Sequence, residues 1–354
     1  MTIRNVAIVG AGIGAAHFKA FAQLGDLFRV AAICELNADR AQPLLDGSPD
    51  TKLVGDLADV LADPTIDIVD VCLPPHLHFD ACARAMEAGK HVICEKPLVS
   101  SVADADTLAK TSARTGRQVF PVFQYRYGKG ATQLRALMDA GLTGKPFVAS
   151  LETHWNRGAD YYAVDWRGTW AGEQGGAILG HAIHIHDWVS FALGPVASVF
   201  AEVATRVNDI EVEDCAAISL RMENGALVTS SVTLGAADDT SRLRFCFEGL
   251  TAESGSNPYA PAEDTWTFTA RAPFAQGPVD DVLASTADAR PGYVGMFTAL
   301  SDALDGRPGC EVTLDDARRS LEFVSAVYGS ARSGQPVALP LQADSPLYDG
   351  WLPG

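Results

Sequence analysis

Short apolar runs alternate with helix-like segments over the first third of the chain. The apolar runs, rich in β-branched residues, lie at 6–9, 30–34, 66–72, 91–94 and 118–122, and the segments predicted as helices lie at 14–24, 38–46, 56–62, 77–88 and 102–115. Strands that are apolar at nearly every position are typical of a parallel sheet whose two faces are both covered by helices. The pattern predicts a doubly wound α/β domain over residues 1–122.

The pattern changes after residue 122. Helices are predicted at 129–140, 176–193, 292–305 and 315–333, and a strand at 146–152. Between residues 196 and 250 apolar and polar positions alternate, and Asn224-Gly225 separates two such runs. An Asn-Gly pair in that setting is the strongest short-range signal of a β-hairpin. We therefore expect a second α/β domain over residues 123–354, built on an antiparallel sheet, with residues 252–292 as its least defined part.

Composition narrows the classes of protein. The 354 residues carry a formal net charge of −17, with 47% apolar and 20% charged residues, which is typical of a folded globular chain. An acidic chain repels nucleic acid, and no apolar run reaches the roughly 18 residues of a membrane span. The start of the chain lacks the pattern of a secretion signal, and seven cysteines without paired spacing favour reduced thiols. We expect a cytoplasmic protein with no nucleic-acid or membrane partner.

A glycine motif lies between the first predicted strand and helix. Gly10, Gly12 and Gly14 form G-x-G-x-G, and Ala15 stands where a third glycine of the usual motif would be. Glycines let the backbone approach a pyrophosphate, and the start of the helix supplies amide donors. The motif predicts a dinucleotide site in a Rossmann fold, and the alternative is a tight turn with no ligand.

An acid follows the second predicted strand. Glu35 lies 21 residues beyond Gly14, where a carboxylate accepts hydrogen bonds from the adenosine ribose and repels a 2′-phosphate. This position favours NAD over NADP, and the alternative is a solvated acid at the end of a strand. Arg40, five residues later, is expected on the next helix.

The region after the third long strand is the most distinctive. Residues 72–98 read CLPPHLHFDACARAMEAGKHVICEKPL and include Glu95-Lys96-Pro97. The chain resembles the glucose–fructose oxidoreductase, inositol dehydrogenase and rhizopine-catabolism (Gfo/Idh/MocA) family, and further matching segments lie at 124–127, 142–146, 166–170, 175–187 and 330–340. The resemblance implies a Rossmann domain at 1–122 and a substrate-binding and oligomerisation domain at 123–354. The second domain would hold a large, mainly antiparallel open sheet that forms a homodimer or homotetramer.

Lysine chemistry must come from the first part of the chain, because all seven lysines lie at or before Lys145. Oxidation of a secondary alcohol needs a base within hydrogen-bond reach of the hydroxyl. Lys96 follows a predicted parallel strand, beside the expected cofactor crevice, and burial together with a nearby nicotinamide cation lowers a lysine pKa. The resemblance makes Lys96 catalytic and Pro97 a candidate cis-proline. The alternative is a structural ion pair of Lys96 with Glu95 or Asp70.

Three histidines and an acid fall within seven residues of the predicted helix at 176–193. His181, His184 and Asp187 have the i, i+3 spacing of one helix side, and His186 points elsewhere. The resemblance makes His184 the second catalytic residue. The chain departs from the family pattern at Gly180, where relatives usually carry Asp or Asn. We expect His181 to compensate by binding substrate. Buried structural histidines are the alternative. A metal site is disfavoured because no further ligand cluster is evident.

The resemblance also assigns contacts to cofactor and substrate. The expected cofactor contacts are Gly10, Gly12, Ile13, Gly14, Glu35, Arg40, Leu73, Pro74, Pro75, His78, Glu95 and Lys96, and the expected substrate contacts are Lys96, Arg126, Arg157, Trp166, Arg167, His181 and His184. The implied function is hydride transfer between NAD and a secondary hydroxyl of a sugar, inositol or related polyol. A glycoside-cleaving enzyme that oxidises its substrate transiently and a non-catalytic NAD-binding regulator remain alternatives.

Overall fold

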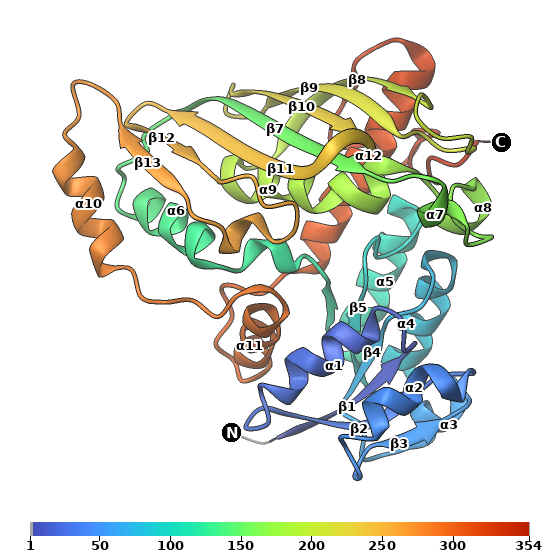
Figure 1. Cartoon of the computed structure of the whole chain (residues 1–354). Helices are drawn as coiled ribbons and strands as arrows, with labels where there is room; N and C mark the ends of the chain where they lie inside the picture. Colours follow the sequence, from blue (N-terminus) through green and yellow to red (C-terminus); the bar gives the residue numbers. More distant parts are fainter. Residues whose placement is uncertain (1–2, 354) are drawn as a thin grey trace. The chain divides into compact units, whose positions relative to one another are not determined.

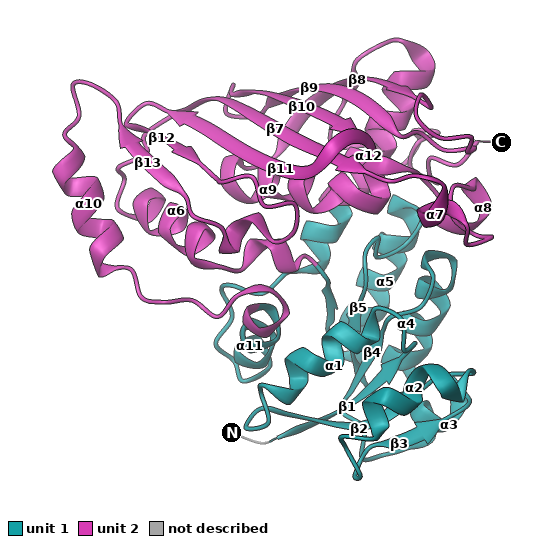
Figure 2. Ribbon diagram, in the orientation of Figure 1, with its two compact units in different colours: residues 1–122, 296–318 teal, residues 123–295, 319–354 magenta. Residues whose placement is uncertain are grey.

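The computed structural model describes residues 3–353 and forms two compact units, shown in Figures 1 and 2. Unit 1 comprises Met1–Val122 and Met296–Arg318, and unit 2 comprises Phe123–Gly295 and Arg319–Gly354. The expectation of an uninterrupted second domain at 123–354 is therefore wrong for residues 296–318. The reason is packing: Phe297 stacks on Phe21 of unit 1 with ring centroids 4.1 Å apart.

Unit 1 contains a six-stranded parallel sheet in the order β3-β2-β1-β4-β5-β6. Its strands are β1 (Arg4–Val9), β2 (Phe28–Cys34), β3 (Lys52–Val54), β4 (Ile68–Val71), β5 (His91–Cys94) and β6 (Val119–Pro121). Every residue of β4 is buried, as expected for a strand covered on both faces. This order is that of the Rossmann fold, in which ligands bind beyond the carboxyl ends of the strands. The predicted doubly wound sheet is confirmed.

Side-chain caps fix several helices around this sheet. The helices are α1 (Gly14–Ala22), α2 (Ala38–Leu45), α3 (Leu57–Ala62), α4 (His78–Glu87) and α5 (Val102–Thr115), with a 3₁₀ turn η1 (Pro75–Leu77). The Ser101 hydroxyl accepts the Asp104 N–H at the start of α5, and Gly116 ends that helix with a left-handed φ of +68°. Both bounds of α5 agree with the prediction, because capping residues mark them in the sequence.

Unit 2 contains an eight-stranded mixed sheet in the order β13-β12-β11-β7-β10-β9-β8-β14. The strands are β7 (Pro146–Asn156), β8 (Val196–Ala204), β9 (Cys215–Met222), β10 (Leu227–Thr233), β11 (Gly235–Phe247), β12 (Leu250–Glu253), β13 (Thr267–Ala270) and β14 (Val337–Ala338). Only the β7–β10 pair is parallel among the pairs of this sheet. β9 and β10 form the hairpin predicted at Asn224-Gly225, with Leu227 opposite Arg221. The mainly antiparallel sheet is confirmed.

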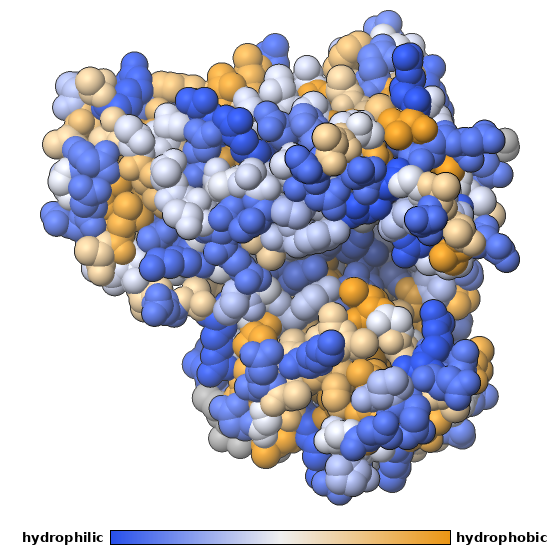
Figure 3. Space-filling model, viewed as in Figure 1, coloured by the Kyte–Doolittle hydropathy of each residue, from blue (hydrophilic) through white to orange (hydrophobic). Residues whose placement is uncertain are grey.

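Helices cover one face of this sheet (Figure 1). Unit 2 contains α6 (Lys129–Asp139), α7 (Ala159–Tyr162), α8 (Trp170–Glu173), α9 (Ile183–Leu193), α10 (Gln276–Ser285) and most of α12 (Leu314–Ser333), while α11 (Gly292–Leu304) continues into unit 1. Along β9 buried residues alternate with the exposed Ala217, Ser219 and Arg221, so the other face is open. On the side of unit 2 that Figure 3 shows, hydrophilic side chains are interspersed with apolar ones. Subunit contact through the open face stays a prediction.

The long helix predicted at 176–193 is two elements. A π-helical segment, η3 (Ile178–Ala182), precedes α9, and the 3₁₀ turns η2 (Gln124–Arg126) and η4 (Pro261–Glu263) lie elsewhere in unit 2. The wider turn of a π-helix rotates the residues that precede α9 relative to those within it. The i, i+3 spacing of His181 and His184 therefore spans the junction between η3 and α9.

Two further findings bear on the composition argument. Within residues 3–353, no helix has the length and apolar character needed to cross a membrane. No disulfide bond joins any of the seven cysteines, all of which lie in that range.

Candidate functional site

The glycine loop of unit 1 connects β1 to α1. Gly10 has a φ of +101°, and a Cβ there would lie 2.5 Å from the Cys72 carbonyl oxygen, so only glycine fits. A Cβ on Gly12 would meet no atom within 4 Å, whereas one on Gly14 would lie 2.7 Å from Cγ2 of Ile8. The loop thus packs closely against β4 on one side and is open at Gly12, where a pyrophosphate can approach the start of α1.

Glu35 follows β2 and holds the same loop. Its Oε2 accepts the Ala11 N–H at 2.9 Å and its Oε1 accepts the Asn37 N–H at 3.0 Å. Burial acts to raise the pKa of Glu35, but these hydrogen bonds and the charge of Arg40 on α2 outweigh it, so the pKa is lowered and the side chain is an anion at neutral pH. The anion at this strand end fits a ribose with free hydroxyls. These residues therefore fit a dinucleotide without a 2′-phosphate.

Apolar surface adjoins the glycine loop and Glu35. Ile13 is 46% exposed beside Gly12, and Leu36, directly after Glu35, is 92% exposed. Leu36 is a residue that the sequence argument did not single out. A large apolar side chain this exposed at a ligand edge offers a surface to a planar ring.

Two loops follow β4 and β5. Leu73, Pro74 and Pro75 follow β4, and Lys96 and Pro97 follow β5, with the Lys96–Pro97 peptide bond cis as predicted. His78 is buried between these loops: its Nδ1 lies 2.7 Å from the Pro97 carbonyl oxygen and its Nε2 lies 2.8 Å from that of Leu73. Burial lowers the pKa of His78, although both carbonyls favour a protonated ring. The His78 ring thus connects the loop after β4 to the loop after β5.

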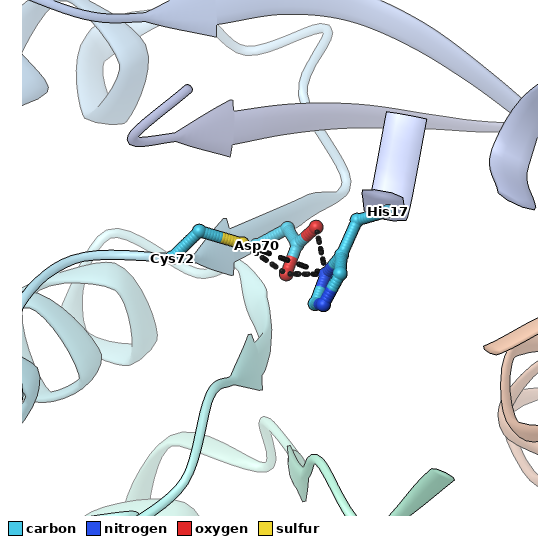
Figure 4. A group of neighbouring side chains, drawn as sticks. All are labelled: His17, Asp70 and Cys72. Atoms are coloured by element: carbon cyan, nitrogen blue, oxygen red, sulfur yellow. Dashed lines mark hydrogen bonds and ion pairs between the residues drawn. The ribbon is translucent and has the colours of Figure 1, made fainter. Parts of the chain in front are cut away.

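A buried group of polar side chains, all from residues that precede Lys96 in the sequence, is shown in part in Figure 4. His17 on α1 points at Asp70 and Cys72 on and after β4, and its other ring nitrogen lies 3.1 Å from Oε1 of Glu95. Oε2 of Glu95 accepts the Lys96 N–H at 3.1 Å. Asp70, considered above as an ion-pair partner of Lys96, therefore binds His17. His17 was missed because nothing in the spacing of a single histidine reveals which acids the sheet places beside it.

In unit 2, the segment η2 holds the start of α9. The His184 ring stacks on Tyr125 with centroids 4.4 Å apart, and Asp187 accepts two hydrogen bonds from Arg126, each at 2.6 Å. Both side chains of that ion pair are nearly buried. Arg126, expected to contact substrate, thus fixes α9 through Asp187 in this structure, and bidentate pairs of this kind are geometrically specific.

His181 lies in different surroundings. It packs edge-on against Trp155 of β7 with centroids 5.1 Å apart and lies 5.5 Å from the ring of Tyr161 on α7. His181 therefore contacts side chains of β7 and α7, whereas the His184 ring contacts Tyr125 of η2. Gly180 is exposed, and a Cβ added there would meet no atom within 4 Å.

Guanidinium groups lie over the aromatic rings near His181. Arg157 lies over Trp155 at 4.8 Å, pairs with Asp239 at 2.8 Å and donates to the Tyr259 hydroxyl at 2.7 Å. The Arg167 guanidinium lies 3.8 Å from the centroid of Tyr161. Trp166 is 43% exposed. Asp239 and Tyr259 were missed, because they lie in strand and loop positions without a motif.

His186 has structural contacts. It is buried, its Nε2 lies 3.0 Å from the Ser230 hydroxyl, and it packs on Phe323. Burial lowers the pKa of His186 to about 3, so the ring is neutral. Among residues 3–353, the potential ligands that converge closely enough for a metal ion are His17, Asp70 and Cys72, and not the histidines near α9.

Comparisons with known proteins agree with this geometry. The model of an oxidoreductase family with an NAD-binding Rossmann fold matches residues 4–123, and that of the GFO/IDH/MocA C-terminal domain matches residues 131–253. An uncharacterized oxidoreductase of Synechocystis is 26% identical over 65% of each chain. An inositol 2-dehydrogenase of Salmonella typhimurium is 32% identical over 42% of this chain and 45% of that protein. The matches therefore span less than two thirds of these relatives.

Solved structures match over nearly the whole chain. The WlbA dehydrogenase of Bordetella pertussis, in complex with NADH and UDP-GlcNAcA, has a TM-score of 0.84 and 27% identity, covering 96% of this chain and 98% of that one. A levoglucosan dehydrogenase in complex with NADH and L-sorbose, with a TM-score of 0.81 and 20% identity over 97% of this chain and 100% of that one, shares the fold. The chain belongs to the GFO/IDH/MocA family of oxidoreductases, and its unit 1 is an NAD-binding Rossmann domain.

Proposed function

We propose that this protein is a dehydrogenase that transfers a hydride between a secondary hydroxyl of a sugar, inositol or related polyol and NAD. The observation that carries the proposal is the position of Lys96, which follows β5 at the carboxyl edge of the sheet and whose amide is bound by Glu95. Cofactor crevices of Rossmann folds lie at this edge. Relatives named as inositol dehydrogenases and the sugar-bound neighbours support the substrate class.

The chemistry divides between cofactor and protein. When bound, NAD⁺ accepts the hydride from the carbon that carries the hydroxyl. The Lys96 amine accepts the hydroxyl proton, for which it must be neutral, and it returns the proton in the reverse reaction. The Glu35 anion orients the adenosine ribose and disfavours NADP.

Unit 2 supplies the groups that we assign to the substrate. His184, stacked on Tyr125, takes part in proton transfer, and His181 binds a substrate hydroxyl. The aromatic rings of Trp155 and Tyr161 offer faces to sugar C–H groups, and Trp166, Arg157 and Arg167 lie on neighbouring segments. This substrate assignment extends the resemblance residue by residue.

A screen tests the reaction class. The protein is incubated with NAD⁺ and, separately, myo-inositol, levoglucosan or UDP-GlcNAcA, and absorbance at the NADH band is recorded. NADH formation with one compound supports the proposal. Turnover of a glycoside without net NADH would favour the glycoside-cleaving alternative, and binding of NAD without turnover of a broad polyol panel would favour the regulator.

Lys96→Met tests the role of the lysine. The variant should lose turnover by about 10²- to 10⁴-fold, the usual loss on removal of a general base, because its thioether accepts no proton at neutral pH. NAD affinity, measured by titration, should remain within about threefold, since Glu35 and the glycine loop are unchanged. Lys110→Met, at an exposed position of α5, is the matched control. Near-normal turnover of Lys96→Met across pH would contradict the assignment.

A further inference from the structure

Three buried residues connect three parts of unit 1 to the backbone of Lys96. His17 comes from α1, Asp70 from β4 and Glu95 from the end of β5; His17 and Asp70 are fully buried and Glu95 is 6% exposed. Figure 4 shows the His17 ring directed at Asp70. The proposed reaction uses neither His17 nor Asp70. Burying the carboxylates of Asp70 and Glu95 is costly unless they are paired, so the group needs an explanation.

The distances define how the group is protonated. Nδ1 of His17 lies 2.9 and 3.1 Å from the two oxygens of Asp70, and Nε2 lies 3.1 Å from Oε1 of Glu95. Ionised carboxylates only accept hydrogen bonds, so a ring that serves both must donate from both nitrogens and is an imidazolium. Burial alone would lower the pKa of His17, but the charge and hydrogen bond of Asp70 reverse this effect and raise it well above 6.5.

Glu95 carries the connection to the loop. Its Oε1 accepts from His17 and its Oε2 accepts the Lys96 N–H, so the carboxylate is fixed at both oxygens. Without the imidazolium, Glu95 would lose the charged partner at its Oε1, and a buried carboxylate that loses a charged partner takes up a proton or moves. Either response changes the hydrogen bond at Lys96.

We propose that His17 is a positioning residue: held by Asp70, it fixes Glu95 and thereby the backbone from which the Lys96 side chain extends. This inference rests on the proposed role of Lys96 in proton transfer. Misplacement of a reacting group by about 1 Å costs about 10²-fold in rate, so a remote anchor of this kind matters for turnover.

A metal ion is the competing explanation of the cluster, because ligand atoms of His17, Asp70 and Cys72 lie within 4.8 Å of one another. The 2.9 Å contact between Nδ1 and Asp70 is a hydrogen-bond distance, which a proton between the two atoms explains.

Glu95→Gln, His17→Asn and Cys72→Ala form the test set. The glutamine is isosteric, but its single oxygen accepts from only one of the two donors that Glu95 serves. Cys72→Ala removes a contact with His17 and leaves the His17–Glu95 contact in place, so it is the matched control. Each protein is labelled with acetic anhydride over a range of pH in the absence of NAD, and labelling of Lys96 relative to the exposed Lys110 is read by mass spectrometry of peptides.

Glu95→Gln and His17→Asn should each change the relative labelling of Lys96 by about threefold or more, equivalent to half a pKa unit. With the compound that gives NADH formation, kcat should fall by about 10- to 100-fold in both variants, and in His17→Asn, which changes no expected cofactor contact, the KM for NAD should stay within about threefold. Cys72→Ala should lower the unfolding temperature but leave both readouts within about twofold.

Two outcomes would overturn the inference. Labelling of Lys96 and kcat that match the Cys72→Ala control in both variants would make the cluster purely structural, and should His17→Asn fail to fold, Glu95→Gln alone decides. Zinc or another metal at one equivalent in the purified protein would replace the proton by an ion. Failure of the proposed function is recognised separately, because Lys96→Met would then retain turnover whatever the labelling of Lys96 in the other variants.

Discussion

His181 and His184 lie three residues apart but in different surroundings. His184 stacks on Tyr125 beside the Arg126–Asp187 ion pair, whereas His181 packs against Trp155 and Tyr161. A ring held in place by a stacked tyrosine and a fixed helix suits proton transfer, which demands precise position. A ring among aromatic side chains suits the binding of a sugar.

The two histidines should therefore differ in their kinetics. His184→Ala should lower kcat by about 10²-fold or more, while His181→Ala should mainly raise the substrate KM, by about tenfold. His186→Gln, on the same helix but bonded to Ser230, is the control and should alter stability and not KM. Steady-state kinetics with the identified substrate measures each effect, and an unchanged KM for His181→Ala would make that residue an ordinary packed histidine.

At this scale the sequence reveals residues that a motif marks. The glycines and Glu35 are predicted from the spacing of strand, turn and helix at a dinucleotide site, and Lys96 is predicted from the resemblance to the family. His17, Glu213 and Asp239 were not found, because their partners are distant in the chain and only the folded sheet brings them together.

The π-helical segment η3 is preceded by residues whose contacts lie far away in the chain. Glu213, before β9, accepts the N–H groups of Gly176 and Ile178 at 3.1 and 2.9 Å and the Tyr328 hydroxyl at 2.9 Å. A Cβ on Gly176 would lie 1.8 Å from the Glu213 carbonyl oxygen, so the chain can pass only as glycine. The sequence predicts a helix here correctly, but the wider turn depends on a carboxylate 35 residues away.

Glu213 should make stability depend on pH. Burial raises its pKa to about 7, against the hydrogen bonds that it accepts. A carboxyl whose pKa is higher in the folded state binds more protons when folded, so its contribution to the free energy of unfolding falls as the pH rises from 5 to 8, by about 3 kcal/mol. Glu213→Gln should remove this dependence.

Urea unfolding of both proteins at pH 5 and pH 8 measures it. Buried histidines with lowered pKa values, such as His78 and His186, act in the opposite direction but contribute equally to both proteins, so the difference between them isolates Glu213. A difference that stays constant within about 0.5 kcal/mol between the two pH values would show that Glu213 does not titrate in this range.

The sequence predicts the type of sheet in each unit, but not which residues belong to each unit. Alternation of strands and helices predicts a parallel sheet, and the Asn-Gly hairpin predicts antiparallel pairing; both are local patterns. Return of residues 296–318 to unit 1 is not local, because a helix with an apolar stripe carries no sign of which core it will cover. The contacts of α11 with the rings of Phe21 and His17 place residues 296–318 in unit 1.

Phe297 is the residue with which this assignment can be tested. It is fully buried, stacks on Phe21 at 4.1 Å and lies edge-on to His17 at 5.4 Å, so it joins the returning segment to α1. Phe297→Ala should lower the free energy of unfolding by about 3 to 5 kcal/mol, the usual loss for a buried phenylalanine. Phe274→Ala, at a half-exposed residue of unit 2, should change it by less than about 0.5 kcal/mol. NAD binds unit 1, so a saturating concentration should restore part of the stability of Phe297→Ala by mass action. Urea unfolding with and without NAD measures both effects. If Phe297→Ala lowers the free energy of unfolding by less than about 1 kcal/mol, α11 does not contribute to the hydrophobic core of unit 1.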